Sequence, residues 1–514
     1  MKKYLLLINL FITGAAIAQT PEDALRYSFQ PQNGTARNLA IGGAMGSLGG
    51  DINATFVNPA GLGFYKTGEF VLSPGFLFNN NKANFRDTKN QSKKNGFNYG
   101  ASGWVWGYTP RYHPKNSNAI SIAVTQTANF NNNIQYKGLN NFSSFSEQFA
   151  EEFAKSGLTI DAVLNMNSQL PYGSAPALYT YLIDTVKVNG VYQVKGAPEY
   201  ILDAGQALRQ EMNRTTTGGI NEFAFGFAHN NNDKLFWGAT IGVPVVNFNS
   251  NTTFKEFDTS NNNANNFKQF DYNDTYSTRG FGFNAKLGII FKPQEYIRLG
   301  LAIHTPTFMS LTDKRTTTLA THLENPVASF SVASTTFTNG QAGESKYTQS
   351  SPFRAIISGS YVFREVSNVK KQRAFITADV EYVNYNGSRF GSDNAAPTTN
   401  EQAYFKQLNE VVKKEYKGNF NFKVGGELKF NVIMGRLGFA YYGNPYKDAP
   451  SKINRMLLSG GLGYRNKGMF FDLTYVHAIT KDIDLPYRLS DRANTYASLK
   501  QQRGNIAATI GFKF

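Results

Sequence analysis

The chain has 514 residues and no cysteine, which excludes disulfides, zinc-thiolate sites and cysteine nucleophiles. Its formal net charge of +16 comes from Lys and Arg scattered along the sequence, without the basic cluster expected of a nucleic-acid-binding protein. The 42 Phe and 28 Tyr residues contrast with a mean hydropathy of -0.37. This composition leaves two classes, a soluble protein or a membrane β-barrel whose strands alternate apolar and polar faces.

The N-terminus has the pattern of a secretory signal peptide. Two lysines precede an apolar run over 4–12, and Ala16-x-Ala18 offers a cleavage site. The run is too short to cross a bilayer as a helix, and its basic start and small-residue end argue against a buried N-terminal helix. We predict a cleavable signal peptide over residues 1–18, so that the mature chain begins at Gln19.

Residues 19–67 show no strand pattern. They contain a glycine-rich stretch over 40–50, and Asn58-Pro59-Ala60 follows shortly before the first predicted strand. A phosphate-binding loop would need a preceding strand and a Gly-Lys-Ser/Thr sequence, and neither is found here. Five glycines either let this segment refold locally or allow it to pack tightly, and the sequence does not choose between the two. They are Gly42, Gly43, Gly46, Gly49 and Gly50.

The remainder of the chain, 68–514, is dominated by segments in which apolar and polar residues alternate. In the clearest one, over 420–430, Phe, Val and Leu alternate with Asn, Lys and Glu. Most of these segments have the roughly nine to eleven residues, or slightly more, that a tilted strand needs to cross a bilayer. We predict fourteen strands, over 70–78, 99–108, 118–130, 217–228, 235–246, 276–291, 296–309, 352–363, 374–385, 419–430, 433–442, 454–464, 468–479 and 505–514.

The links between these strands alternate between long and short, as in outer-membrane barrels with long external loops and short periplasmic turns. Long links span 79–98, 131–216, 247–275, 310–351, 386–418, 443–453 and 480–504, and short links span 109–117, 229–234, 292–295, 364–373, 431–432 and 465–467. A large soluble β-sandwich or repeat array, the alternative, has no reason to alternate in this way. We therefore predict a 14-stranded antiparallel transmembrane β-barrel with both chain ends in the periplasm.

The longest link, 131–216, is predicted to be partly helical. Phe145, Phe149 and Phe153 recur at helical spacing beside acidic residues, and 200–212 suggests a second amphipathic helix. Such helices would either cover the barrel mouth as a lid or offer their apolar faces as a landing groove for a hydrophobic ligand.

The glycine-rich stretch followed by Asn58-Pro59-Ala60 resembles the N-terminal hatch of the FadL/TodX family of outer-membrane transporters. Segments 298–306, 379–385 and 441–446 are similar to the same family, so the resemblance covers essentially the whole mature chain. It implies a fourteen-stranded barrel in which residues 19–67 form a hatch, or plug, inside the lumen.

Three residues, Asn58, Pro59 and Ala60, carry over from the family pattern as hatch residues. The resemblance does not assign ligand-contacting residues, because the loop lengths here leave no motif to anchor them.

The resemblance also implies a function. Members of the family take up long-chain fatty acids or aromatic hydrocarbons, which implies passive diffusion through a plugged barrel with lateral release into the outer membrane of a Gram-negative cell. A water-filled pore suits such ligands poorly, since exposing a methylene to water costs about 0.8 kcal/mol. The alternative is a protein-binding component of an outer-membrane secretion or assembly complex. A closed wall favours a monomer, and no nucleic-acid partner is expected.

Charged residues on the predicted inward face are expected to pair across strands or to hold the hatch. They are Lys286, Arg298, Arg354, Asp379, Glu381, Lys423, Glu427, Arg436 and Asp472. Of these, Arg298 and Arg354 are candidate contacts for a ligand carboxylate. No pair among the five His has metal-ligand spacing and no Gly-x-Ser-x-Gly sequence occurs, so we predict no catalytic or metal site, no cofactor and no enzyme activity.

Overall fold

A computed structural model describes residues 21–29, 31, 33–188, 190–324, 327–363, 373–447 and 453–514. The predicted signal peptide and most of the predicted short link over 364–373 lie outside these ranges. Within them, no helix combines the length and the hydropathy needed to cross a bilayer.

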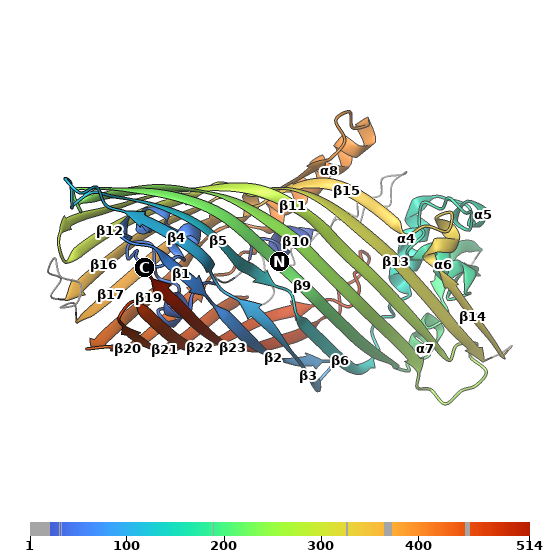
Figure 1. Cartoon of the computed structure of the whole chain (residues 1–514). Helices are drawn as coiled ribbons and strands as arrows, with labels where there is room; N and C mark the ends of the chain where they lie inside the picture. The colour runs from blue at the N-terminus through green and yellow to red at the C-terminus, as the bar shows by residue number, and fades with distance from the viewer. Residues whose placement is uncertain are drawn as a thin grey trace.

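The described chain forms a closed antiparallel β-barrel of fourteen spans, which confirms the predicted fold class (Figure 1). Some spans consist of two strands separated by a short interruption. In chain order the spans are β1 (Glu69–Leu72) with β2 (Pro74–Phe85), β3 (Thr88–Tyr99) with β4 (Ser102–Tyr108), β5 (Ser117–Asn129) with β6 (Asn132–Asn140), β9 (Leu208–Asn231), β10 (Leu235–Asp258), β11 (Gln269–Gln294), β12 (Ile297–His304) with β13 (Phe308–Glu324), β15 (Gly343–Ser350) with β16 (Arg354–Phe363), β17 (Ala374–Asn384) with β18 (Arg389–Ser392), β19 (Gly418–Phe430), β20 (Ile433–Tyr442), β21 (Asn454–Asn466), β22 (Met469–Asp484) and β23 (Ala497–Lys513). The first span, β1 and β2, pairs with the last, β23, and this closes the barrel.

The other elements after residue 68 lie between these strands, most of them in the long links. They are α4 (Glu147–Ser156), α5 (Ile160–Val163), α6 (Ser174–Tyr179), β7 (Ile183–Val188), β8 (Val191–Gly196), α7 (Glu199–Asp203), β14 (Val327–Ala333), η2 (Ser334–Phe337), η4 (Tyr385–Gly387) and α8 (Thr399–Glu415). Figure 1 shows α4 to α7 gathered at one end of the barrel, with the C-terminus toward the other end. We call the end with these helices the outer end.

The predicted second helix over 200–212 is wrong in its second half. Helix α7 ends at Asp203, and from Leu208 the chain already belongs to β9. Leu208, Gln210 and Met212 are buried at alternate positions, which is the two-residue period of a strand.

Several spans are also longer than predicted. β10 continues to Asp258 and β11 begins at Gln269, so most of the predicted link over 247–275 is strand. The predicted link over 79–98 is likewise a hairpin of β2 and β3. These extensions lie beyond the apolar part of the wall, where outward positions are polar and the alternation of apolar and polar residues disappears.

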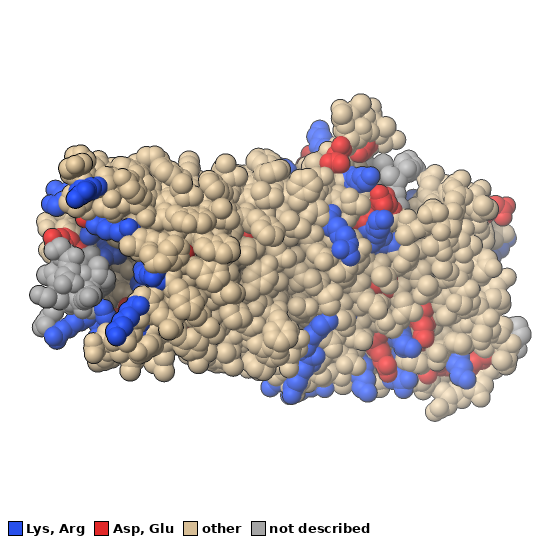
Figure 2. All heavy atoms as spheres, viewed as in Figure 1, with Lys and Arg blue, Asp and Glu red and all other residues tan. Residues whose placement is uncertain are grey.

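The two faces of the wall differ as the alternation predicts. Along β19, Phe420, Phe422 and Val424 are 44–52% exposed, whereas Asn421 and Lys423 between them are buried. Figure 2 shows a broad band with few charged side chains between charged regions toward the two ends. Most of the charges predicted to face inward are buried: Lys286, Arg298, Asp379, Glu381, Lys423, Arg436 and Asp472.

The N-terminal segment, residues 21–65, packs against the inner face of this wall. It contains α1 (Pro21–Arg26), α2 (Ala36–Ala40), α3 (Ala54–Val57) and the 3-10 helix η1 (Pro59–Phe64). Helix α2 contacts β20 to β23, and η1 contacts β5, β9, β10 and β11 on other parts of the wall. Nearly every residue over 34–63 is buried, so this segment lies inside the barrel.

Asn58 ties the middle of the N-terminal segment to two wall strands. Its Oδ1 accepts a hydrogen bond from the backbone N–H of Ala60 at 3.1 Å, which caps η1. Its Nδ2 donates to the carbonyl oxygen of Gly46 at 2.5 Å. The same nitrogen lies 3.3 Å from the carbonyl oxygen of Ile289 on β11 and 3.4 Å from that of Leu301 on β12. One side chain therefore joins the glycine-rich stretch, η1 and the wall.

Glycines in the wall make room for these contacts. A Cβ added at Gly288 on β11 would lie 1.8 Å from Oδ1 of Asn58. A Cβ added at Gly238 on β10 would lie 2.6 Å from the carbonyl carbon of Pro59. The seat of the Asn58-Pro59-Ala60 motif is thus formed by wall positions that tolerate no side chain.

The five glycines of the N-terminal segment serve its backbone geometry. Gly42, Gly43, Gly49 and Gly50 have φ between +66° and +78°, a conformation that other residues adopt at a cost. Gly46 does not have a positive φ, but a Cβ added there would lie 2.7 Å from Cβ of Ser358. Turn geometry and close packing account for all five, and local refolding of the segment stays a prediction.

We expect Gly288→Ala to destabilise the protein by about 1–3 kcal/mol, because the added methyl group overpacks the site against Asn58. The measurement is the midpoint of denaturant-induced unfolding in detergent. Gly359→Ala on β16 is the control, since a Cβ there meets no atom within 4 Å. Equal midpoints for the two variants would show that the N-terminal segment is not seated at Gly288.

Candidate functional site

A cavity of about 1220 Å³ lies between the N-terminal segment and the outer end. Its lining comes from α1, from α8, from the wall strands β5, β6, β9 to β11, β13 and β21 to β23, and from residues 485–496, which link β22 to β23. This volume exceeds the roughly 300–1,000 Å³ of common small-molecule pockets. The cavity can therefore hold a long ligand.

One side of the cavity is apolar and aromatic. Phe130, Ile134, Phe248 and Tyr276 line it from neighbouring spans. The rings of Phe130 and Phe248 meet edge to face at 5.3 Å, and those of Phe248 and Tyr276 at 6.1 Å. Such a surface offers dispersion contacts and burial to an apolar ligand without demanding hydrogen bonds from it.

Most arginines of the cavity are neutralised by a carboxylate. Nη1 of Arg214 lies 2.5 Å from Oδ1 of Asp484, and Nη2 of Arg315 lies 2.8 Å from Oδ2 of Asp274. Arg26 contacts Asp23 in the same way within α1. The part of the chain that the structure describes contains no group of three or more His, Asp or Glu side chains placed to hold a metal ion. The carboxylates of Asp23, Asp274 and Asp484 are partners of these arginines.

Arg455 on β21 and Arg503 on β23 differ, because neither is paired with a carboxylate among the described residues. Nε of Arg455 donates to Oγ1 of Thr480 at 3.1 Å, and its guanidinium lies 4.8 Å from the ring centre of Phe29. Arg503 lines the cavity and makes no hydrogen bond or ion pair with any described residue. In the sheet, Arg455 is opposite Thr480 and Arg503 is opposite Ala478, so the two cations flank β22. This corner of the cavity suits an anion.

The structure places Arg298 and Arg354 away from the large cavity. Nη1 of Arg298 donates to the carbonyl oxygen of Leu48 at 2.8 Å. Nη2 of Arg354 donates to the carbonyl oxygen of Ser28 at 2.6 Å, and Arg354 lines a separate cavity of about 140 Å³. Both arginines thus hold the N-terminal segment, which was the other role expected of inward charges. Their contact with a ligand carboxylate stays a prediction.

Sequence reasoning missed the arginines of the large cavity, although a signal for them exists. Arg455 falls in the predicted strand over 454–464, on its inward face. Arg503 falls just before the predicted strand over 505–514, and extending the same alternation by two residues would have turned it inward.

The wall is not uniformly hydrogen-bonded. The second span consists of β3 and β4. β4 forms a hydrogen-bonded ladder with β5 of the third span. Among the described residues β3 forms a ladder with β2 on one side and none on the other side. Along this stretch β3 runs beside β6, and no ladder joins them. We call this boundary the seam and define it by residues 92–98 on one side and 129–133 on the other.

Side chains close the seam in place of a ladder. Nδ2 atoms of Asn79 and Asn81 on β2 both donate to Oδ1 of Asn132 at 2.6 Å. Oγ of Ser92 on β3 donates to the carbonyl oxygen of Asn133 at 2.7 Å. A rotation of these side chains would release the contacts without breaking a backbone ladder.

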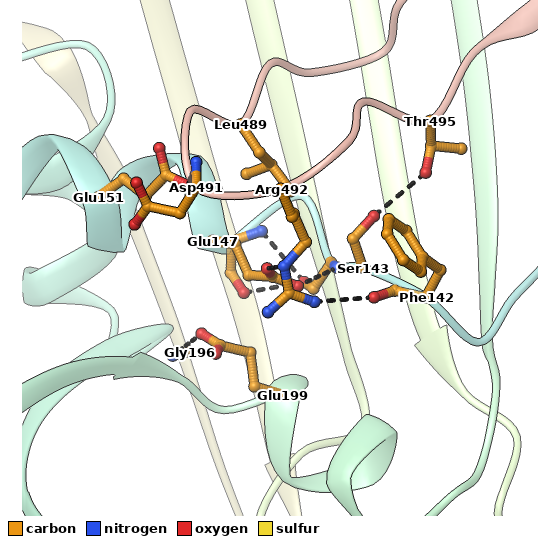
Figure 3. Close-up of polar contacts among 12 residues, drawn as sticks. Phe142, Ser143, Glu147, Glu151, Gly196, Glu199, Leu489, Asp491, Arg492 and Thr495 are labelled. Atoms are coloured by element: carbon orange, nitrogen blue, oxygen red, sulfur yellow. Dashed lines mark hydrogen bonds and ion pairs between the residues drawn. The ribbon is translucent and has the colours of Figure 1, made fainter. Parts of the chain in front are cut away.

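At the outer end, the segment 485–496, which we call the strap, crosses the cavity. Nε of Arg492 lies 3.1 Å from Oε2 of Glu147 at the start of α4, and its Nη1 donates to the carbonyl oxygen of Phe142 at 2.9 Å (Figure 3). Backbone N–H groups of Ser490 and Asp491 donate to the Glu151 carboxylate at 2.9 and 3.2 Å. Hydrogen bonds and an ion pair thus fix the strap to the helical link over 131–216.

The strap also reaches the N-terminal segment. Arg488 forms an ion pair with Glu22 of α1. The hydroxyl of Tyr487 donates to the carbonyl oxygen of Ser143 at 2.9 Å. One segment therefore contacts both the outer helices and the floor of the cavity.

Two carboxylates lie close to the Arg492 latch. Glu199 accepts a hydrogen bond from the backbone N–H of Gly196 at 2.5 Å and lies beside Glu147 (Figure 3). Burial raises the pKa of Glu199 to about 7, with the Glu147 carboxylate adding to the effect and the Gly196 N–H opposing it. Burial also raises the pKa of Glu147 above its ordinary range, against the bond from the Ser144 N–H and the charge of Arg492.

No protein-family profile and no curated protein matches the sequence of this chain. Solved structures do match its fold. A FadL homologue from Pseudomonas aeruginosa is 13% identical, with 94% of this chain and 99% of that chain covered and a TM-score of 0.50. The toluene transporter TodX from P. putida is 13% identical with the same coverage and a TM-score of 0.51.

These comparisons show that the chain has the fold of a closed fourteen-stranded β-barrel. Its particular form is that of FadL and TodX, as the sequence resemblance predicted. At 13% identity the likeness concerns the fold and does not extend to the ligand.

We expect the region around α7 to loosen as the pH rises. A carboxyl whose folded-state pKa is raised stabilises the fold fully below its ordinary pKa, and this contribution is lost as the pH rises through about 7. Amide hydrogen exchange over α7 and β8 should therefore be slower near pH 5 than near pH 8, after correction for the intrinsic rate.

Glu199→Gln should remove most of this pH dependence, since the amide stays neutral and can still accept the Gly196 bond. Asp161→Asn, at an exposed position of the same link, is the matched control and should keep the wild-type profile. A wild-type profile in Glu199→Gln would rule out this carboxyl as the cause.

Proposed function

We propose that this chain is an outer-membrane transport protein that takes up hydrophobic small molecules bearing a carboxylate, by passive diffusion into the large cavity and lateral release into lipid. In this proposal the export signal over 1–18 directs the chain to the outer membrane of a Gram-negative cell. The N-terminal segment acts as the plug that prevents free passage of water and solutes along the lumen.

The observation that carries the proposal is that the large cavity borders the seam. Asn129, Phe130 and Asn132 line the cavity and also belong to the boundary where the wall lacks a backbone ladder. A ligand in the cavity is therefore separated from the outside of the wall by side-chain contacts alone. The apolar surface formed by Phe130 and Ile134 leads toward this boundary.

Lateral release follows from the energetics of an apolar tail. Each methylene that leaves an apolar site for water costs about 0.8 kcal/mol, so a long tail released into the periplasm would meet a barrier of roughly 10 kcal/mol. An exit through the wall transfers the tail from the cavity to lipid and avoids that cost.

The two unpaired arginines favour an acid over a neutral hydrocarbon. Arg455 and Arg503 line the cavity and lack a carboxylate partner among the described residues. A ligand carboxylate would supply that partner through charge-assisted hydrogen bonds. Its tail would then extend toward Phe130 and the seam.

Replacing Arg503 by Gln should weaken the binding of a long-chain fatty acid by roughly ten- to a hundredfold, since a hydrogen bond to a charged group contributes about 1.5–3 kcal/mol. Binding of the methyl ester of the same acid should change little. The measurement is the dissociation constant of each ligand for the purified full chain in detergent.

Arg279→Gln is the control, because Arg279 is exposed on the outward face of β11. It should leave both dissociation constants unchanged. Equal losses for acid and ester in Arg503→Gln would mean that the arginine does not bind a carboxylate.

A disulfide across the seam should block release. An ideal Cβ at Gly96 would lie 3.7 Å from Cβ of Asn131, within the roughly 3.5–4.5 Å that a disulfide needs. The chain has no cysteine, so the double variant Gly96→Cys, Asn131→Cys would contain one defined pair. The oxidised variant should lose most transfer of a fluorescent fatty acid into reconstituted vesicles, and reduction should restore it.

Each single cysteine variant serves as a control and should transfer at the wild-type rate under oxidising and reducing conditions. Undiminished transfer in the oxidised double variant would contradict lateral release through the seam.

A further inference from the structure

Five lysines gather on the outward face of neighbouring strands. Lys500 on β23 is directly opposite Lys481 on β22 and directly opposite Lys82 on β2. Lys89 and Lys93 on β3 lie on the two diagonals from Lys82. All five are exposed, and the alternation of their strands turns them away from the lumen. We call them the lysine cluster.

This arrangement is electrostatically unfavourable by itself. Directly opposite residues in an antiparallel pair have Cβ atoms about 4.5–5.5 Å apart, and like charges there destabilise the sheet. Diagonal neighbours, at about 7–8 Å, are still within reach of long side chains. None of the five side chains has an ion pair or hydrogen bond with any described residue. The cluster is therefore an uncompensated patch of positive charge.

Other outward lysines of the same wall are compensated. Lys255 on β10 is directly opposite Asp271, with Nζ 2.9 Å from Oδ2. Lys314 on β13 is directly opposite Glu344, with Nζ 3.1 Å from Oε2. The register of the barrel thus places acids against lysines elsewhere and lysines against lysines at the cluster. The exception points to an external anion.

The cluster lies at the outer border of the apolar belt. On β2 the outward residues Phe76 and Phe78 precede Lys82 by a few positions, and Lys82 lies roughly 13 Å beyond Phe78 at about 3.3 Å per residue. Figure 2 shows basic side chains gathered over β2 and β3, at the edge of the band with few charges. Lipid headgroups meet a barrel at this level.

We propose that the lysine cluster binds the phosphate groups of a phosphorylated glycolipid in the outer leaflet. The inference rests on the outer-membrane location in the proposed function. Ammonium groups bind phosphates as point charges, and a headgroup with two phosphates can bridge lysines on adjacent strands. The acyl chains of the same lipid would pack against Phe76 and Phe78, which a free phosphate ion could not do.

The position of the cluster gives such a lipid a structural effect. It would join β22 and β23 to β2 and β3, and β3 forms one side of the seam. A bound lipid would therefore hold the β2–β3 hairpin to the rest of the wall while the opposite side of the seam moves.

The test uses the purified full chain in detergent, titrated with lipid A, with lipid A from which the phosphates have been removed, and with inorganic phosphate. The wild-type chain should bind lipid A and should bind the dephosphorylated lipid at least tenfold more weakly. Lys82→Gln, Lys500→Gln should weaken lipid A binding on the order of tenfold, as expected for the loss of two lysines near an anionic surface.

The matched control is Lys255→Gln, Lys314→Gln, which removes two outward lysines that face carboxylates. It should bind lipid A like the wild type. Equal losses in the two double variants, no preference for the phosphorylated lipid, or full competition by inorganic phosphate at the concentration of lipid A would each overturn the proposal. Fatty acid binding in the cavity is measured on the same samples, so a failure of the transport proposal would be seen separately.

Discussion

The backbone hydrogen bond is the constraint on which this structure depends. In lipid an unsatisfied N–H or C=O group costs several kcal/mol, so a wall of strands must pair every edge. The barrel meets this requirement by pairing its first span with its last. The seam is the exception, and there the side chains of Asn81 and Ser92 both donate to the carbonyl oxygen of Asn133, which faces no ladder partner on β3. An opening that breaks side-chain contacts is compatible with a wall that otherwise cannot open.

Filling the lumen is a second consequence of closure. A barrel this wide leaves space that its own side chains do not fill, and here the N-terminal segment occupies part of it. Several buried charges on the wall form ion pairs, as in Arg436, whose Nε lies 2.6 Å from Glu427 and whose Nη1 lies 2.5 Å from Asp472. Breaking such a pair leaves an uncompensated charge, so these pairs fix the register more than they add stability. The Asn58 seat adds the same specificity between plug and wall.

The sequence predicts the wall well because lipid imposes a pattern on it. Phe420 and Phe422 must face lipid while Asn421 faces the lumen, and this alternation identifies a span without any tertiary information. The pattern fails beyond the lipid, so the outer part of β10 up to Asp258 was predicted as a loop. Helix α8 was missed although its sequence carries the helical pattern, since Tyr404, Leu408 and Val412 recur every four residues and are buried.

The candidate site was less predictable, because it depends on which residues lack a partner. Arg298 and Arg503 look alike in sequence, yet Arg298 donates to Leu48 and Arg503 faces the cavity with no described partner. The seam is equally hard to predict, since β3 is polar over most of its length and its missing neighbour is a property of the assembled wall. The asparagines over 79–81 and 131–133 were the local sequence signal for the seam, because their short side-chain amides can form hydrogen bonds in place of a backbone ladder.

The strap makes the outer end and the plug depend on one another. Its Arg492 is held by Glu147 of the outer helices, and its Arg488 is held by Glu22 of α1. Helix α1 also carries Arg26, whose guanidinium lies 4.3 Å from the ring centre of Phe248 on the aromatic side of the cavity. A displacement of the strap therefore displaces α1, which lines the cavity, or breaks the ion pair between Arg488 and Glu22. Since the strap itself lines the cavity, a ligand that enters past it disturbs the outer latch and the plug through the same segment.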